Sequence, residues 1–164
     1  MATLYIMVGI PGAGKTTYAK NKLKHAIRIG SDDLRKEFFG KELTLKGYRA
    51  IHTTMCKRAA AHLRNGQDVV IDCMNASIRS RRVYFRILPP KCSIVAIYLH
   101  TPVRRALRNN QNRSRHVPMI GILFTRLRLC PPRKSEGFHR VIRYTQTKRT
   151  HVIMASGEQD THQK

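Results

Sequence analysis

The chain has 164 residues, the length of one compact domain, and its 32 Lys plus Arg against 9 Asp plus Glu give a formal net charge of +23. A hydrophobic fraction of 41% excludes a disordered chain, and no apolar run approaches the ~18 residues of a membrane span, so no membrane partner is expected. A field this positive attracts polyanions, which makes nucleic acid the first partner to consider.

The four cysteines, Cys56, Cys73, Cys92 and Cys130, have neither paired metal-binding spacing nor a redox Cys-x-x-Cys arrangement. They are typical of free thiols in a reducing compartment, and zinc is not expected. The opening residues MATLYIMVGI lack the basic start and the cleavage site of a signal peptide. These features predict an intracellular, cytoplasmic protein.

In the N-terminal half, short β-branched runs alternate with amphipathic stretches. The pattern predicts strands at Leu4–Val8 and Ala26–Ile29, a helix at Lys15–Lys24 between them, and helices at Asp32–Phe39 and Gly47–Arg64 after them.

The C-terminal half repeats the alternation. The predicted strands are Asp68–Asp72, Ser93–Leu99 and Phe138–Tyr144; the predicted helices are Ser77–Leu88, Pro102–Asn110 and Val117–Leu129, with the apolar side chains of the last in the core. The polar remainder, 145–164, is expected to be a partly disordered tail with at most one short strand, at HVIMA.

This alternation predicts an α/β fold with three layers, α/β/α, around a mostly parallel five-stranded sheet. Residues 1–144 should form the domain. In such sheets ligands bind beyond the carboxyl ends of the strands. Gly9, Asp32, Asp72 and His100 each follow a predicted strand and should therefore share one rim, although His100 is more typical of a polar strand end than of a ligand.

The segment GIPGAGKTT, residues 9–17, fits the phosphate-binding pattern G-x-x-x-x-G-K-[ST] between a strand and a helix. Its glycines let backbone N–H groups wrap phosphates, Lys15 reaches the same oxygens, and the Thr16 hydroxyl can ligate Mg²⁺. The motif predicts ATP or GTP binding by Gly9, Pro11, Gly12, Ala13, Gly14, Lys15, Thr16 and Thr17.

The segment IGSDDLR, residues 29–35, pairs carboxylates with an arginine at the next strand end. Asp32 could orient and deprotonate a hydroxyl that attacks the γ-phosphate, and Arg35, three residues on, shares its helix face and could hold a neighbouring phosphate. Asp33 is rotated away and is interpreted as a helix-start acid, with a possible contact to Arg35.

The ordered set GIPGAGKTT, SDDLR, VVIDCMN, LRNNQNRSRHVP and EGFHRVI resembles the P-loop polynucleotide kinases, over roughly residues 4–144. The resemblance implies ATP and Mg²⁺ as cofactors, with Lys15 and Thr16 on the donor phosphates and the metal. It implies Asp32 as general base and Arg35 on the acceptor's 3′-phosphate. It also implies an arginine-bearing lid over about residues 109–117, with Arg113 on the transferring phosphate and Arg108 and Arg115 as alternatives in register.

After the third predicted strand the family has an Asp closely followed by an Asn, and DCMN offers Asp72 and Asn75 as acceptor-side residues. Asp72 could alternatively be a metal-side carboxylate or a strand-end cap. The arginines at 79, 81 and 82 either flank the acceptor groove or form a solvated helix face.

The sequence therefore predicts an ATP-dependent kinase that phosphorylates the 5′-hydroxyl of DNA or RNA. A P-loop kinase for a small-molecule hydroxyl would use the same loop and base, but it would not need extended arginine clusters. A non-catalytic nucleic-acid-binding P-loop module would not need SDDLR.

Overall fold

The computed structural model describes residues 1–40, 47–112, 116–146 and 151–155. Strand β1 (Thr3–Val8) lies at the centre of the sheet, between β3 (Val69–Asp72) and β4 (Ser93–His100), and is parallel to both. Strands β2 (Ile27–Gly30) and β5 (Arg140–Gln146) continue the parallel sheet outward. The order β2-β3-β1-β4-β5 confirms the predicted five-stranded parallel core.

A sixth strand, β6 (His151–Ala155), pairs antiparallel with β5, at the one place where the sequence allowed a further strand. Strand β5 itself runs to Gln146, two residues past the expected domain boundary.

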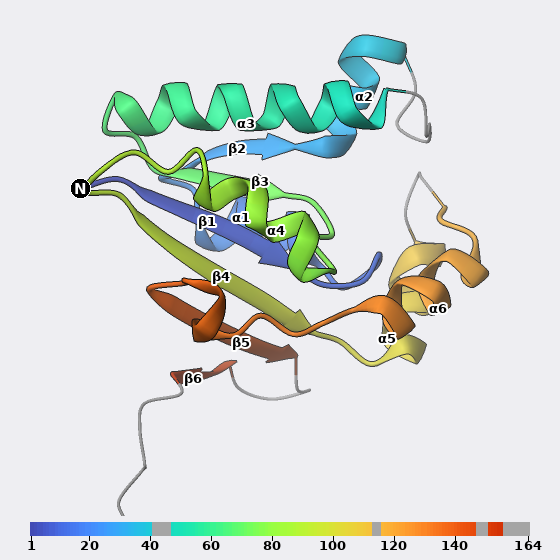
Figure 1. Cartoon of the computed structure of the whole chain (residues 1–164). Coiled ribbons are helices and arrows are strands. Elements are labelled where there is room, and N and C mark those ends of the chain that lie inside the picture. Colours follow the sequence, from blue (N-terminus) through green and yellow to red (C-terminus); the bar gives the residue numbers. More distant parts are fainter. Residues whose placement is uncertain (41–46, 113–115, 147–150, 156–164) are drawn as a thin grey trace, which may run out of the picture.

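Helices cover both faces of the sheet, as Figure 1 shows. Helix α1 (Lys15–Lys22) packs behind β1 and β3, while α3 (Tyr48–Arg64) and α4 (Ile78–Phe85) lie on the opposite face. This follows from right-handed crossovers: the β1–β2 connection crosses the sheet in one direction and the β2–β3 and β3–β4 connections in the other.

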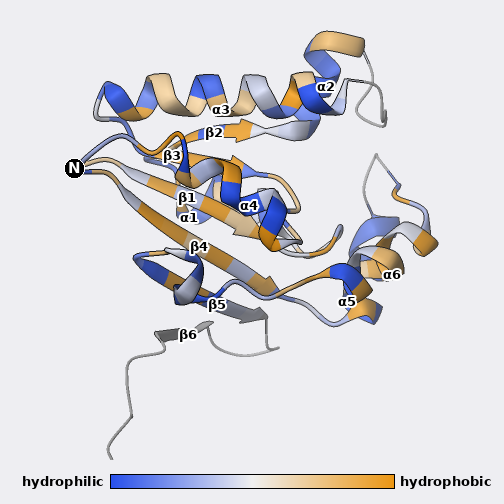
Figure 2. Ribbon diagram, in the orientation of Figure 1, coloured by the Kyte–Doolittle hydropathy of each residue, from blue (hydrophilic) through white to orange (hydrophobic). Residues whose placement is uncertain are grey.

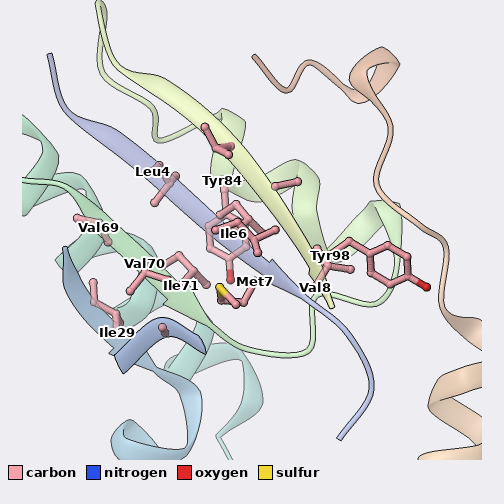
Figure 3. Packing of buried hydrophobic residues seen from close by; sticks show 14 of the residues in the cluster. Leu4, Ile6, Met7, Val8, Ile29, Val69, Val70, Ile71, Tyr84 and Tyr98 are labelled. Carbon is pink, nitrogen blue, oxygen red and sulfur yellow. The ribbon is translucent and has the colours of Figure 1, made fainter. Parts of the chain in front are cut away.

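The core is aliphatic and lies between these layers. Six consecutive residues of β4, Ile94–Leu99, are buried, as expected for a strand covered on both faces. Leu4, Ile6 and Ile71 make the interior of β1 and β3, and Tyr84 of α4 is completely buried beside them (Figure 3). Figure 2 shows hydrophobic, orange segments along these strands.

The remaining elements lie near the carboxyl ends of the strands or connect to them. Helix α2 (Ser31–Phe39) starts directly after β2, and α5 (Val103–Gln111) and α6 (Met119–Arg128) lie beyond the tip of β4 (Figure 1). A 3₁₀ turn, η1 (Lys134–Glu136), precedes β5. Within the described ranges, no helix combines the length and the apolar character that crossing a bilayer requires.

The prediction that the apolar face of the helix at Val117–Leu129 lies in the core is wrong for most of its residues, since only Ile122 and Leu129 are buried. Of that helix, observed as α6, only Ile122 is buried; Ile120 and Leu127 are 75% and 84% exposed. The reason is position: α6 packs on α5 past the ends of the strands, so the sheet does not reach its apolar side.

Candidate active site

The turn from β1 to α1 has the backbone of a phosphate-binding loop. Gly9, Gly12 and Gly14 have backbone φ angles of 155°, 78° and 87°, which residues with a Cβ rarely adopt. A Cβ on Gly12 would collide with the carbonyl of Ala106, so the loop can approach α5 only with glycine there. Gly14 is the N-cap of α1 and supplies no side-chain cap, which leaves phosphate as a suitable cap for the first turn.

Lys15 folds back over this loop. Its Nζ donates to the carbonyl oxygens of Gly9 at 2.9 Å and Ile10 at 2.8 Å. These bonds place the ammonium group over the loop, where nucleotide phosphates would lie in a motif of this type. Thr16 is half-buried next to it, and Thr17 is exposed.

Neighbouring elements hold the loop from three sides. Asn109 of α5 donates to the Gly12 carbonyl at 2.9 Å, and Thr101, just after β4, donates to the Ala13 carbonyl at 3.3 Å. On the third side, the Gly9 amide donates to the Met74 carbonyl at 3.1 Å. The loop is thus preorganised by protein contacts, which lowers the cost of ordering it around phosphate.

Asn75 supports the same region from within. It adopts φ 46°, is 3% exposed, and donates from Nδ2 to the Met7 carbonyl at 2.9 Å. Its Oδ1 is buried, and the described residues provide no hydrogen-bond partner for it. The direct contact of Asn75 with an acceptor stays a prediction, because the structure shows its amide directed to the β1 backbone.

The register of the strands brings the predicted acceptor side to the same rim as the loop. Gly30 of β2 pairs with Asp72 of β3, and β3 pairs with β1, which leads into the phosphate-binding loop. Immediately after Gly30, Asp32 and Arg35 face each other on α2, with Arg35 Nη1 donating to Asp32 Oδ1 at 3.0 Å. Their side chains are 40% and 15% exposed, so the carboxylate is the more open of the two.

Arg28 is a residue of this rim that the sequence did not single out. From the middle of β2 it contacts Asp33 Oδ2 at 2.6 Å through Nη2 and Asp72 Oδ2 at 2.9 Å through Nη1. Gly30 makes room, because a Cβ there would meet both Arg28 and Asp33. The partner of Asp33 is therefore Arg28 and not Arg35.

This bridge also bears on Asp72. Its side chain is 6% exposed and bound by Arg28, so Asp72 ties β3 to the start of α2. A role of Asp72 toward an acceptor or a metal stays a prediction. The sequence did contain a signal for this bridge: Arg28 lies inside the otherwise apolar strand IRIG, and a charged side chain in such a strand needs an ionic partner.

The predicted lid lies between α5 and α6. Of the three candidates for the lid arginine, Arg113 and Arg115 lie outside the described residues, and Arg108, just before the segment, is exposed on α5. The ends of the segment are fastened by Asn110, which donates to the Val117 carbonyl at 2.8 Å and accepts from its amide at 3.0 Å. Residues 109–111 belong to α5, so the connection is shorter than the predicted 109–117.

His100 ends β4 on the same rim. Burial lowers the pKa of its imidazole, and the charges of Arg143 and Arg126 lower it further. The ring packs edge-on against Tyr98, with centroids 5.8 Å apart.

Arg81 is neither a groove residue nor part of a solvated face, which corrects both interpretations of it. Its guanidinium is fully buried and donates to both carboxylate oxygens of Glu136, at 2.8 and 2.7 Å. It also donates to the carbonyls of Asn75 and Cys130. These partners satisfy a buried charge that water cannot reach.

The residues present suit nucleotide phosphates and Mg²⁺. The loop offers backbone N–H groups at an uncapped helix start, the Lys15 ammonium group and the Thr16 hydroxyl, which together match a Mg²⁺-bound polyphosphate.

Comparisons with known proteins agree with this geometry. A chain in the structure of the Pnkp1/Rnl/Hen1 RNA repair complex is 26% identical, with a TM-score of 0.69 over 78% of this chain and 44% of that one. A chain in another structure of that complex is 28% identical, with a TM-score of 0.60 over 71% of this chain and 40% of that one. This chain thus spans less than half the length of both.

The structures of a gluconokinase and of a sugar kinase share the fold of this chain. A gluconokinase from Sinorhizobium meliloti is 18% identical, with a TM-score of 0.60 over 87% of this chain and 82% of that one. A sugar kinase from Janibacter sp. is 19% identical, with a TM-score of 0.65 over 88% and 85%. No curated protein sequence matches the chain.

The sequence model of the AAA domain family matches residues 4–120, which include the phosphate-binding loop, the Asp32–Arg35 pair and the whole of α5. This match covers well over half of the chain, and the sheet order is that of P-loop kinases. The chain belongs to the AAA domain family and has the fold of P-loop kinases.

Proposed function

We propose that the chain is an ATP-dependent polynucleotide kinase that transfers the γ-phosphoryl group of ATP to the 5′-hydroxyl of DNA or RNA. The observation that carries the proposal is the Asp32–Arg35 pair, 3.0 Å apart at the rim that also holds the phosphate-binding loop. A carboxylate next to a guanidinium suits an acceptor that has both a hydroxyl and a phosphate, as a nucleic-acid 5′ end does.

The roles follow from this arrangement. The loop amides and Lys15 would bind the donor phosphates and neutralise charge that develops during transfer. Thr16 would hold Mg²⁺, which when bound supplies further charge neutralisation and orients the phosphates. Lys15 is already held over the loop by its hydrogen bonds to Gly9 and Ile10, which lowers the free-energy cost of ordering it around the phosphates.

On the acceptor side, Asp32 would orient the 5′-hydroxyl for in-line attack and take up its proton. Arg35 would bind the phosphate on the 3′ side of the same nucleotide. A guanidinium has five N–H donors and the bond to Asp32 uses Nη1, so donors remain for a phosphate. Arg113, which the resemblance assigns to the lid, would cover the transferring group.

Two further observations support a polynucleotide acceptor. Two chains that are 26% and 28% identical to this one belong to an RNA repair complex. The net charge of +23 also far exceeds what a small anionic acceptor needs.

A sugar or sugar-acid acceptor is the second candidate, because this chain spans 82% and 85% of the two sugar-kinase structures and less than half of the RNA repair chains. The same loop and the same Asp32 would serve that reaction. Only the acceptor would differ, and with it the need for Arg35.

An acceptor panel tests the proposal. Purified protein is incubated with radiolabelled ATP and Mg²⁺ together with 5′-hydroxyl DNA, 5′-hydroxyl RNA, nucleosides, nucleoside 3′-phosphates or gluconate. Transfer to oligonucleotides and nucleoside 3′-phosphates is the expected result. Transfer to gluconate or nucleosides alone would contradict it, and tight salt-sensitive oligonucleotide binding without any transfer would favour a non-catalytic module.

A further inference from the structure

Helix α4 presents a stripe of arginines to solvent. Arg79, Arg82 and Arg86 are all exposed and follow one another at spacings of three and four residues, which places them on one side of the helix. The stripe extends over about 10 Å, the rise of seven helical residues. Arg81 of the same helix points the other way and is fully buried.

The stripe has no acidic counterpart. In the described ranges, no carboxylate lies within ion-pair distance of any of its three guanidinium groups. The nearby acid, Glu136, is bound by Arg81 through both of its oxygens. The Arg81–Glu136 pair also anchors the η1 turn against α4, and that turn exposes Arg133 and Lys134. Unpaired guanidinium groups in this arrangement suit a phosphate chain, which each can bind through two N–H groups.

The stripe begins at the active-site rim. Helix α4 starts six residues after Asp72, capped by Ser77, whose side chain accepts from the Ser80 amide. Arg79, the first arginine of the stripe, is the second residue of α4. The strand before α4 ends at Asp72, which pairs with Gly30 and is joined through Arg28 to Asp33 at the start of α2. The stripe therefore starts close in the chain to the rim that holds Asp32 and Arg35.

We propose that the stripe Arg79–Arg82–Arg86 binds the phosphate backbone of the acceptor strand, downstream of the 5′-terminal nucleotide held by Asp32 and Arg35. This inference rests on the proposed polynucleotide kinase function and adds the path of the substrate to it. About 10 Å accommodates about three phosphates at the 3.4 Å axial spacing of a duplex strand. Backbone contacts of this kind hold strands of any sequence.

The experiment compares two variants with equal loss of charge. One replaces the stripe (R79A/R82A/R86A); the other (K20A/K22A/K24A) removes three exposed lysines in and after α1, which covers the opposite face of the sheet. For each, KM and kcat are measured with 5′-hydroxyl acceptors that lengthen from a nucleoside 3′-phosphate and a dinucleotide to about twelve nucleotides.

For the natural chain, KM should fall with acceptor length and then level off. The arginine variant should lose that gain, with KM for the longest strand raised about tenfold or more and values for the nucleoside 3′-phosphate unchanged. The lysine variant should keep it. The slope of log KM against log salt should fall by about 2 in the arginine variant only, since each single-strand phosphate contact contributes about 0.7.

Three results would overturn the inference: equal weakening in both variants, an equal change for short and long acceptors, or no length dependence in the natural chain. Failure of the proposed function is distinguishable, because then even the nucleoside 3′-phosphate receives no phosphate. In that case fluorescence anisotropy with a labelled strand still compares the two variants. Equal affinities there reject the stripe as a nucleic-acid surface.

Discussion

Arg81 and Glu136 form a bidentate ion pair in the interior, 55 residues apart in sequence, with side chains 0% and 7% exposed. The pair joins α4 to the turn before β5. Through Nη1, Arg81 also holds the carbonyl of Asn75, whose own side chain supports β1 next to the phosphate-binding loop. Arg81 thus connects the turn before β5 to Asn75, which supports the strand that leads into the phosphate-binding loop.

Removing one partner of this pair should destabilise the fold strongly. Glu136→Gln leaves the buried guanidinium of Arg81 without a countercharge, and Arg81→Ala does the same to the buried carboxylate of Glu136. Removing one partner of a buried ion pair typically costs about 3–5 kcal/mol. Urea denaturation measures the change in the free energy of unfolding. The exposed pair Arg58–Glu37, at 44% and 47% exposure, is the control, and Arg58→Ala should cost less than about 1 kcal/mol. Similar costs at the two sites would show that burial of Arg81 is not what makes its ion pair important.

Substitutions of the two adjacent carboxylates of α2 should have clearly different effects on kcat. Asp32→Asn preserves shape but cannot accept the acceptor's proton, so kcat should fall by about 10²–10⁴ while ATP affinity stays nearly the same. Asp33→Asn loses only a contact to Arg28 and is the matched control, with a far smaller effect on kcat. Single-turnover transfer and nucleotide titration give the two quantities. A loss of ATP binding in Asp32→Asn, or equal losses of kcat in both variants, would contradict the base assignment.

Much of this architecture could be predicted from sequence because its signals are local. The β-branched runs gave the parallel strands, and the glycine loop between a strand and a helix gave the nucleotide site. The three-residue spacing of Asp32 and Arg35 predicted that they share a helix face, and the structure places them 3.0 Å apart.

Other features depend on tertiary contacts that no local pattern contains. The partner of Arg81 is 55 residues away, so a buried arginine could not be distinguished from a solvated one. The apolar side of α6 has the period of a core helix, but the period does not say whether a sheet lies opposite it. Arg28 matters only because β2 and β3 align in register.

Among the glycines of the described residues, Gly12 should be the one whose substitution weakens nucleotide binding most. In Gly12→Ala the new Cβ meets the Ala106 carbonyl and φ of 78° is unfavourable, so the loop must move and ATP affinity should fall by at least about tenfold. Gly40→Ala is the control: its φ of 63° carries a similar backbone penalty of about 1–2 kcal/mol, but nothing lies within 4 Å of the new Cβ. Nucleotide titration of both folded variants should show weakened binding only in Gly12→Ala; weakening in both would assign the effect to general strain.

His52 should make the fold less stable in mild acid. Burial lowers the pKa of its imidazole below the usual 6.5, and its neighbours Tyr48, Cys56 and Tyr84 have raised pKa values, so they stay neutral in this range. Below about pH 6.5 the unfolded chain therefore binds a proton that the folded chain does not, and the free energy of unfolding falls with pH, by at most about 1.4 kcal/mol per pH unit.

The measurement is urea denaturation at several pH values between about 7.5 and 5, for the natural chain and for His52→Phe, which keeps a ring between the aromatic neighbours. The variant should show a shallower decline, and the two curves should run parallel above about pH 7. His100, whose pKa is also lowered, leaves a residual slope in both proteins. An unchanged slope in His52→Phe would contradict this prediction. It would mean that the imidazole of the natural chain takes up its proton equally in the folded and the unfolded state, despite its burial against Tyr84.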